Sequence, residues 1–176
     1  MIPRFSPTVT FGGALRFLLD VALSRDDSNV VGRFEQAFAQ YQGCEHALFV
    51  PSGRMALLLI LQRLGYPPGS EIVVPAFTHF SIPSVIRHAG LTPVFADLDA
   101  ATYELTPDTV RVVLTSRTRA VIPTHLFGRT CPMPGLIALA RERKIDVIED
   151  CAQALGARVG ERRAGQGGVA AYFTFG

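Results

Sequence analysis

The chain has 176 residues, of which 48% are hydrophobic and 18% are charged, so it can bury a good-sized core and is expected to form one globular domain. Its 17 basic and 15 acidic residues leave a formal net charge of +2, which gives no lasting field to attract nucleic acid or an anionic membrane. The longest purely aliphatic run, Met55–Leu61, is far too short to span a bilayer. We therefore expect neither a nucleic-acid partner nor a membrane partner.

Periodicity predicts two helices, followed by strands that alternate with further helices. Apolar residues recur at helical spacing over Ala14–Ser24 and Val31–Tyr41. Five short aliphatic runs are then predicted to be strands: His46–Val50, Glu71–Val74, Pro93–Ala96, Arg119–Ile122 and Ile145–Ile148. The last four begin 22 to 26 residues apart, which leaves room for one crossover helix in each interval. The predicted fold class is therefore α/β, a mostly parallel sheet with helices on both faces.

Local signals mark the ends of several of these elements. Two prolines within Gly65–Gly69 end the helix that begins near Gly53, because proline cannot continue the hydrogen-bond ladder. Thr106, as an N-cap in front of a proline, predicts a helix over Pro107–Ser116. Val169–Phe175 is a further β-like run.

The cysteines predict neither a disulfide framework nor a metal site. Cys44, Cys131 and Cys151 are odd in number, widely spaced and free of any C-x-x-C pattern. A reducing cytoplasm fits this cysteine usage best.

A parallel sheet binds ligands at the carboxyl ends of its strands, so the residues directly after each run are the candidates for a site. The turn Pro51–Ala56 opens a helix whose free N–H groups favour a phosphate, although Ser52 taken alone is more simply an ordinary N-cap. The segment Phe77–Phe80 could stack on a flat ring or pack beneath the next helix. His125 lies in a third such turn, and its role is left open.

The sharpest signal is the strand that ends in Glu149 and Asp150. Side chains alternate along a strand, so the two acids face opposite ways and one of them can point into the cleft. Asp150 and Gln153 would then hold a carboxylate and an amide near one ligand. A magnesium or ribose contact, or a helix-capping acid, is the alternative. The string Gly165–Ala170 matches G-x-G-x-x-[GA], but it precedes a strand, which argues against a Rossmann dinucleotide site.

In this order and spacing, the segments resemble the DegT/DnrJ/EryC1/StrS aminotransferases, a branch of the pyridoxal 5'-phosphate (PLP) enzymes of fold type I. The resemblance is closest in Glu71–Asp97 and Val147–Ala157 and runs from about Phe34 to the last residue. It implies an N-terminal arm and helix over residues 1–30 and an incomplete PLP-binding large domain over residues 31–176. It also implies that the family's C-terminal small domain is absent.

The resemblance implies seven cofactor-binding residues. They are Ser52, Gly53, Arg54, His79, Asp150, Gln153 and Thr174. The first three occupy the family's phosphate turn, with Arg54 in place of the usual threonine, and Thr174 adds a phosphate ligand. His79 lies where the family places an aromatic ring against the pyridine face. Asp150 pairs with the pyridine nitrogen and keeps it protonated, and Gln153 contacts the phenolic oxygen.

The chemistry and the partners are implied in the same way. The complete enzyme moves an amino group, with glutamate as the expected amino-acid donor, onto a keto sugar carried on a nucleotide, which becomes an amino sugar. Fold-type I enzymes are usually homodimers, so we expect a homodimer of the complete protein.

The family's Schiff-base lysine has no counterpart in the chain, so we expect no catalytic residue in it and no turnover by it alone. The family places this lysine a few residues after Thr174, whereas the single lysine of the chain is Lys144. Lys144 begins the strand that ends in Asp150, and this length of strand separates them by roughly 17–20 Å. Two other hypotheses stay open: a lysine-less protein that binds PLP or a nucleotide sugar, and an α/β domain for another phosphate ligand.

Overall fold

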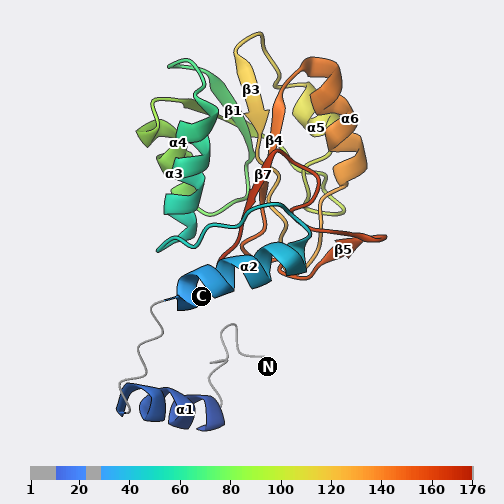
Figure 1. Ribbon diagram of the computed structural model, residues 1–176. Helices are drawn as coiled ribbons and strands as arrows, with labels where there is room; N and C mark the ends of the chain where they lie inside the picture. Colours follow the sequence, from blue (N-terminus) through green and yellow to red (C-terminus); the bar gives the residue numbers. More distant parts are fainter. Residues whose placement is uncertain (1–10, 23–28, 176) are drawn as a thin grey trace.

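The computed structural model describes residues 11–22 and 29–175, which contain a five-stranded sheet (Figure 1). Across the sheet the strands are β2 (Thr92–Ala96), β1 (Glu71–Pro75), β3 (Thr118–Val121), β4 (Asp146–Asp150) and β7 (Ala170–Tyr172). Each strand is parallel to its neighbours. A separate short hairpin is formed by β5 (Arg158–Val159) and β6 (Arg162–Arg163). The predicted α/β class is confirmed.

Helices cover both faces of the sheet, as predicted. The described helices are α1 (Phe11–Ala22), α2 (Val30–Gln42), α3 (Gly53–Leu64), α4 (Ser81–His88), α5 (Pro107–Arg111) and α6 (Met133–Arg143). Figure 1 shows α3 and α4 on one side of the sheet and α5 and α6 on the other. No helix within residues 11–22 and 29–175 is long and apolar enough to cross a bilayer.

Side chains that alternate along the central strands fill two separate cores. Ile72 and Val74 of β1 pack in the core beneath α3 and α4, whereas Val73 packs in the core beneath α5 and α6. In β4, Ile148 packs in the core beneath α3 and α4, and Val147 packs in the core beneath α5 and α6. Because both faces of the sheet are covered, β1 is buried along its whole length and its sequence is a nearly continuous apolar run.

The predicted strand His46–Val50 is wrong, because the segment has no regular secondary structure. Leu48 and Phe49 are 73% and 50% exposed. The Phe49 N–H donates to the carboxylate of Glu35 at 2.7 Å instead of to a neighbouring strand, and the Phe49 ring packs edge-on against Phe34 of α2. A strand needs a neighbour that completes its hydrogen bonds, and an apolar run does not supply one.

The predicted helix Pro107–Ser116 is also too long, since α5 ends at Arg111. The next two residues are β-branched valines, which fit a helix less well. The Thr115 N–H then donates to the Thr118 hydroxyl at 3.0 Å, which draws the chain out of the helix and into β3.

The remaining boundaries follow the predictions more closely. β1, β2, β3 and β4 begin and end within about two residues of the predicted runs, a margin that is usual for element ends. β7 occupies only the centre of the predicted run 169–175. The end of the predicted helix 14–24 lies beyond Ala22, outside the described residues.

Candidate functional site

Hydrogen bonds join the segments that follow β1, β3, β4 and β7 at one edge of the sheet. Thr78, after β1, and Thr124, after β3, share a hydrogen bond of 3.1 Å between their hydroxyl groups. Thr124 also forms a parallel bridge with Asp150 at the end of β4. The Cys151 N–H donates to the Tyr172 carbonyl of β7 at 2.9 Å. This carboxyl edge is where the sequence places the candidate site.

Ser52, Gly53 and Thr174 come together at the start of α3. Ser52 is the N-cap of α3, and its hydroxyl accepts a hydrogen bond from the Met55 N–H at 3.2 Å. Gly53 is needed here, because a Cβ atom would lie 2.7 Å from the Cγ2 atom of Thr174. The Thr174 hydroxyl donates to the Ala152 carbonyl at 3.2 Å. Free helix N–H groups and two nearby hydroxyls make this corner suited to a phosphate.

Asp150 is 3% exposed and ends β4 at the same edge. Its Oδ1 atom accepts the Ala152 N–H at 3.1 Å. Burial raises the pKa of Asp150, and the Ala152 N–H and the nearby Tyr172 hydroxyl oppose this only in part. The Tyr172 hydroxyl is itself buried without a hydrogen bond of normal geometry, and burial together with the Asp150 charge raises its pKa. A cation placed against Asp150 would favour its ionised form.

His79 lies exposed at the rim of this edge. Its Nδ1 atom is 2.7 Å from the Ser81 hydroxyl, and its ring lies 4.4 Å from the Phe80 ring at an interplanar angle of 34°. His79 is close enough to Asp150 for its charge, when protonated, to lower the pKa of that acid. The imidazole is therefore held at Ser81 and lies beside the buried carboxyl group.

Gln153 and Arg54 are exposed at the rim as well. The Oε1 atom of Gln153 accepts the Phe127 N–H at 3.3 Å, so this side chain holds the segment after β3. Lys144 lies elsewhere: it caps the end of α6 with a left-handed backbone (φ 54°) and precedes the amino end of β4, whereas Asp150 is at the carboxyl end.

Three residues of the edge were not among those predicted: Tyr172, Thr78 and Thr124. Tyr172 lies two residues before Thr174, so strand alternation from Thr174 places both side chains on the same side. Thr78 falls inside the aromatic segment after β1. Thr124 offered no comparable signal, because its role depends on contacts with distant parts of the chain.

Glu149 lies on the other side of β4, in a separate buried cluster. Donor atoms of His125, Glu149 and Cys151 lie within 4.8 Å of one another, a spacing that suits a metal ion. However, His125 and Glu149 are hydrogen-bonded to each other at 2.9 Å, and burial raises the pKa of the Cys151 thiol, which disfavours the thiolate that binds metals. Burial also acts to raise the pKa of Glu149, but hydrogen bonds from His125 and from glycine N–H groups hold it below its ordinary value. We assign no metal to this cluster.

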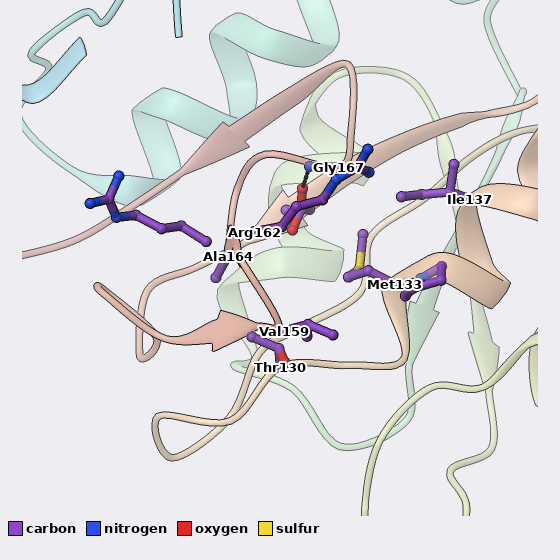
Figure 2. A pocket seen from close by; sticks show the side chains of 10 residues that line it. Thr130, Met133, Ile137, Val159, Arg162, Ala164 and Gly167 are labelled. Atoms are coloured by element: carbon purple, nitrogen blue, oxygen red, sulfur yellow. Dashed lines mark hydrogen bonds between the residues drawn. The ribbon is translucent and has the colours of Figure 1, made fainter. Parts of the chain in front are cut away.

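Two hollows lie outside the candidate site. One of about 300 Å³ is lined by three exposed aromatic rings and by Arg129. The other, of about 40 Å³, lies between α6 and the loop that leads to β7 (Figure 2). Neither is lined by Ser52, Asp150 or Thr174.

A parallel sheet with helices on both faces and a site at its carboxyl edge is the large-domain architecture of the PLP enzymes of fold type I. Residues 20–176 match the model of the DegT/DnrJ/EryC1/StrS aminotransferase family. The chain belongs to this family.

The relatives and structural neighbours include several aminotransferases. UDP-N-acetyl-3-dehydro-alpha-D-glucosamine 3-aminotransferase of Acidithiobacillus ferrooxidans is 40% identical over 141 residues, which are 80% of this chain and 38% of that protein. The X-ray structure of the aminotransferase from Psychrobacter cryohalolentis has a TM-score of 0.90 at 34% identity, covering 96% of this chain and 44% of that one. The PLP form of the sugar aminotransferase Spr1654 from Streptococcus pneumoniae has a TM-score of 0.80 at 28% identity, over 83% and 41% of the two chains. The chain spans less than half the length of each of these proteins.

Proposed function

We propose that the chain is the cofactor-binding part of a PLP-dependent aminotransferase. In the whole protein, an amino group moves from an amino acid, glutamate in this proposal, to a keto sugar carried on a nucleotide, which becomes an amino sugar. The observation that carries the proposal is the buried Asp150 carboxyl group at the same edge as the Ser52–Gly53–Thr174 corner. The name of the A. ferrooxidans relative, a 3-aminotransferase for a UDP-linked 3-dehydro sugar, supports the substrate class.

The start of α3 would hold the phosphate of the cofactor. The N–H groups that follow Ser52 point out of the helix without partners inside it, and the helix dipole favours an anion there. The Thr174 methyl group lies against Gly53, and the Thr174 hydroxyl, which donates to the Ala152 carbonyl in the free chain, would turn to the phosphate to add a donor. The exposed Arg54 guanidinium adds a positive charge beside the same turn.

The rest of the edge would hold the ring. His79 would stack on its face, Gln153 would contact the phenolic oxygen, and Asp150 would face the protonated nitrogen. The fit to a cation rests on two features of the free chain, the buried Asp150 carboxyl group, which accepts the Ala152 N–H, and the Tyr172 hydroxyl, which is buried without a hydrogen bond of normal geometry. When bound, PLP supplies an electron sink for loss of the substrate α-proton, and Asp150 sustains it by keeping the ring nitrogen protonated.

The chain by itself is proposed to bind the cofactor without turnover. Transamination needs an amine within reach of the ring, both to carry the cofactor and to move the α-proton. Lys144, the single lysine, precedes the amino end of β4, and residues 11–22 and 29–175 bring no other lysine to the carboxyl edge. The same observation favours a second candidate, a lysine-less protein that binds PLP or a nucleotide sugar.

Pyridoxamine 5'-phosphate (PMP), which has the ring and the phosphate but no aldehyde, is the probe that tests the site. We expect the purified chain to bind PMP, and Ser52→Ala to weaken binding about tenfold, because a cap and a phosphate contact are lost together. Fluorescence titration measures the affinity. Ser116→Ala is the control, since Ser116 is exposed at the opposite edge of the sheet. Failure to bind PMP, with binding of a different phosphate compound, would favour the generic phosphate-binding domain.

Borohydride reduction separates the two PLP-binding candidates in the whole protein. In an aminotransferase, borohydride should fix PLP covalently to a lysine, and excess PMP should prevent this labelling by occupying the site. A PLP site that is lost in Asp150→Ala, with no trapped adduct, would instead support the lysine-less binding protein. In the 176-residue chain, Lys144→Arg removes the only side-chain amine and is the control for adventitious labelling.

We propose that the complete protein is a cytoplasmic homodimer. Val30, Val31, Leu48 and Phe49 are between 46% and 73% exposed, on α2 and the segment that follows it. Apolar surface gathered in this way is typical of contacts with another chain or with further structure. We therefore expect the 176-residue chain to self-associate at micromolar concentration in sedimentation velocity. A stable, monodisperse monomer would contradict this.

A further inference from the structure

The buried carboxylate of Glu149 binds three N–H groups of a single loop. Its Oε1 atom accepts the Gly167 N–H at 2.6 Å (Figure 2) and the Gly168 N–H at 2.9 Å. Its Oε2 atom accepts the Gly165 N–H at 2.9 Å. This loop leads directly into β7. Asp150, the next residue of β4, lies at the candidate cofactor site. The two adjacent acids therefore point to opposite sides of the strand, Glu149 to the loop and Asp150 to the candidate site.

His125 completes the set of donors around this carboxylate. It is fully buried, and its Nε2 atom lies 2.9 Å from Oε2 of Glu149. Its Nδ1 atom accepts the Cys131 N–H at 3.1 Å and therefore carries no proton. The proton must sit on Nε2, so a neutral imidazole donates to Glu149. Four N–H groups thus converge on one buried negative charge.

The loop can reach Glu149 only because Gly167 and Gly168 have no side chain. A Cβ atom on Gly168 would lie 2.3 Å from the Val147 carbonyl oxygen. A Cβ atom on Gly167 would lie 2.9 Å from the Cδ1 atom of Ile137 and 3.3 Å from Oε1 of Glu149. The glycine string that resembles a dinucleotide motif therefore has another physical role, which is close contact with β4.

We propose that Glu149 is a positioning residue that sets the register of β7 and so holds Tyr172 and Thr174 at the cofactor edge, an inference that rests on the proposed function. In the observed register Glu149 pairs with Ala171 and Asp150 with Tyr172. Thr174 then lies against the start of α3. A slip of one residue would turn Tyr172 and Thr174 to the opposite face of the sheet. The anchor lies before β7 in the chain, where it fixes the strand as it enters the sheet.

Glu149→Gln tests the anchor with little change of shape. Glutamine keeps one acceptor oxygen but replaces the other with an NH₂ group. In one orientation this NH₂ group faces the N–H groups of Gly167 and Gly168. In the other orientation it faces the donors of His125 and Gly165. His125 cannot adapt by moving its proton, because the Cys131 N–H occupies Nδ1. Donor therefore faces donor in either orientation. Glu161→Gln is the control, because Glu161 is exposed in the nearby β5–β6 turn.

Two measurements report the expected result. Amide hydrogen exchange over residues 165–172 should accelerate at least about tenfold in Glu149→Gln, while exchange in β1 stays unchanged. PMP affinity should fall about tenfold, and affinity for pyridoxamine, which has no phosphate, should fall less, because Thr174 contributes to the phosphate corner. The ratio of the two affinities separates positioning from a general loss of stability.

The proposal is overturned if Glu149→Gln keeps the wild-type exchange over residues 165–172. It is equally overturned if exchange in β1 accelerates as much as exchange over residues 165–172 and the ratio of PMP affinity to pyridoxamine affinity does not change. Glu149 would then contribute only to the stability of the whole fold. If the variant does not fold, Gly168→Ala displaces the same loop from its own side and must give the same pattern. Wild-type protein that binds no PMP would count against the proposed function, and the exchange comparison would still report whether Glu149 holds the loop.

Discussion

Asp150→Asn is expected to weaken PMP binding about 100-fold and, at the same time, to raise the midpoint of thermal unfolding of the ligand-free chain at pH 7 by about 3 °C. Affinity falls because the amide has no negative charge for the protonated ring nitrogen. Stability rises because burial penalises the charged form of Asp150 and so raises its pKa, whereas asparagine carries no charge. Asparagine keeps the Oδ1 atom that accepts the Ala152 N–H.

The sign of this stability effect depends on pH. A group whose pKa is raised in the folded state contributes stability below its ordinary value of 3.8 and loses that contribution as the pH rises through the raised value. Asparagine should therefore have its advantage at pH 7 and lose it near pH 3, as measured by calorimetry at both values. Asp97→Asn is the matched control, because Asp97 is exposed and its Oδ1 atom also accepts a backbone N–H. Unchanged PMP affinity in Asp150→Asn would remove Asp150 from the cofactor site.

Ile148→Ala is expected to lower the free energy of unfolding by about 3–4 kcal/mol, as measured by urea denaturation. Ile148 is fully buried in the middle of β4 and packs in the core beneath α3 and α4. That core is formed jointly by α3, α4 and residues of β1, β3 and β7, so the cavity cannot close readily. Val112→Ala, at a position that is 82% exposed, should change the free energy by less than about 0.5 kcal/mol. A loss below about 1 kcal/mol for Ile148→Ala would contradict the position of this core.

The sequence predicts β1 correctly because burial sets the pattern of this strand. β1 is apolar throughout because helices cover both of its faces, and that condition is visible in a single run of residues. The run His46–Val50 is also rich in apolar residues, but no strand of the described residues pairs with it. Pairing is a property of two segments, so the composition of one segment does not reveal it.

For the candidate site, the sequence singles out the acids at the end of β4 but does not determine their orientation. Alternation requires that Glu149 and Asp150 face opposite ways, and it leaves open which of them faces the cleft. The structure decides through contacts distant in the chain: glycine amides that follow β6 bind Glu149, and Tyr172 of β7 lies beside Asp150. Those partners have no local signature near residue 150.

The two neighbouring carboxyl groups differ in how they respond to acid. Because its pKa is raised, Asp150 takes up its proton at a higher pH than an exposed aspartate does, and with that proton it loses its attraction for a cationic ligand. Glu149, whose pKa is lowered, stays ionised to a more acidic pH and continues to tether the glycine loop. Mild acidification should therefore release the cationic ligand while the fold remains intact, and only stronger acid should weaken the attachment of the glycine loop to β4.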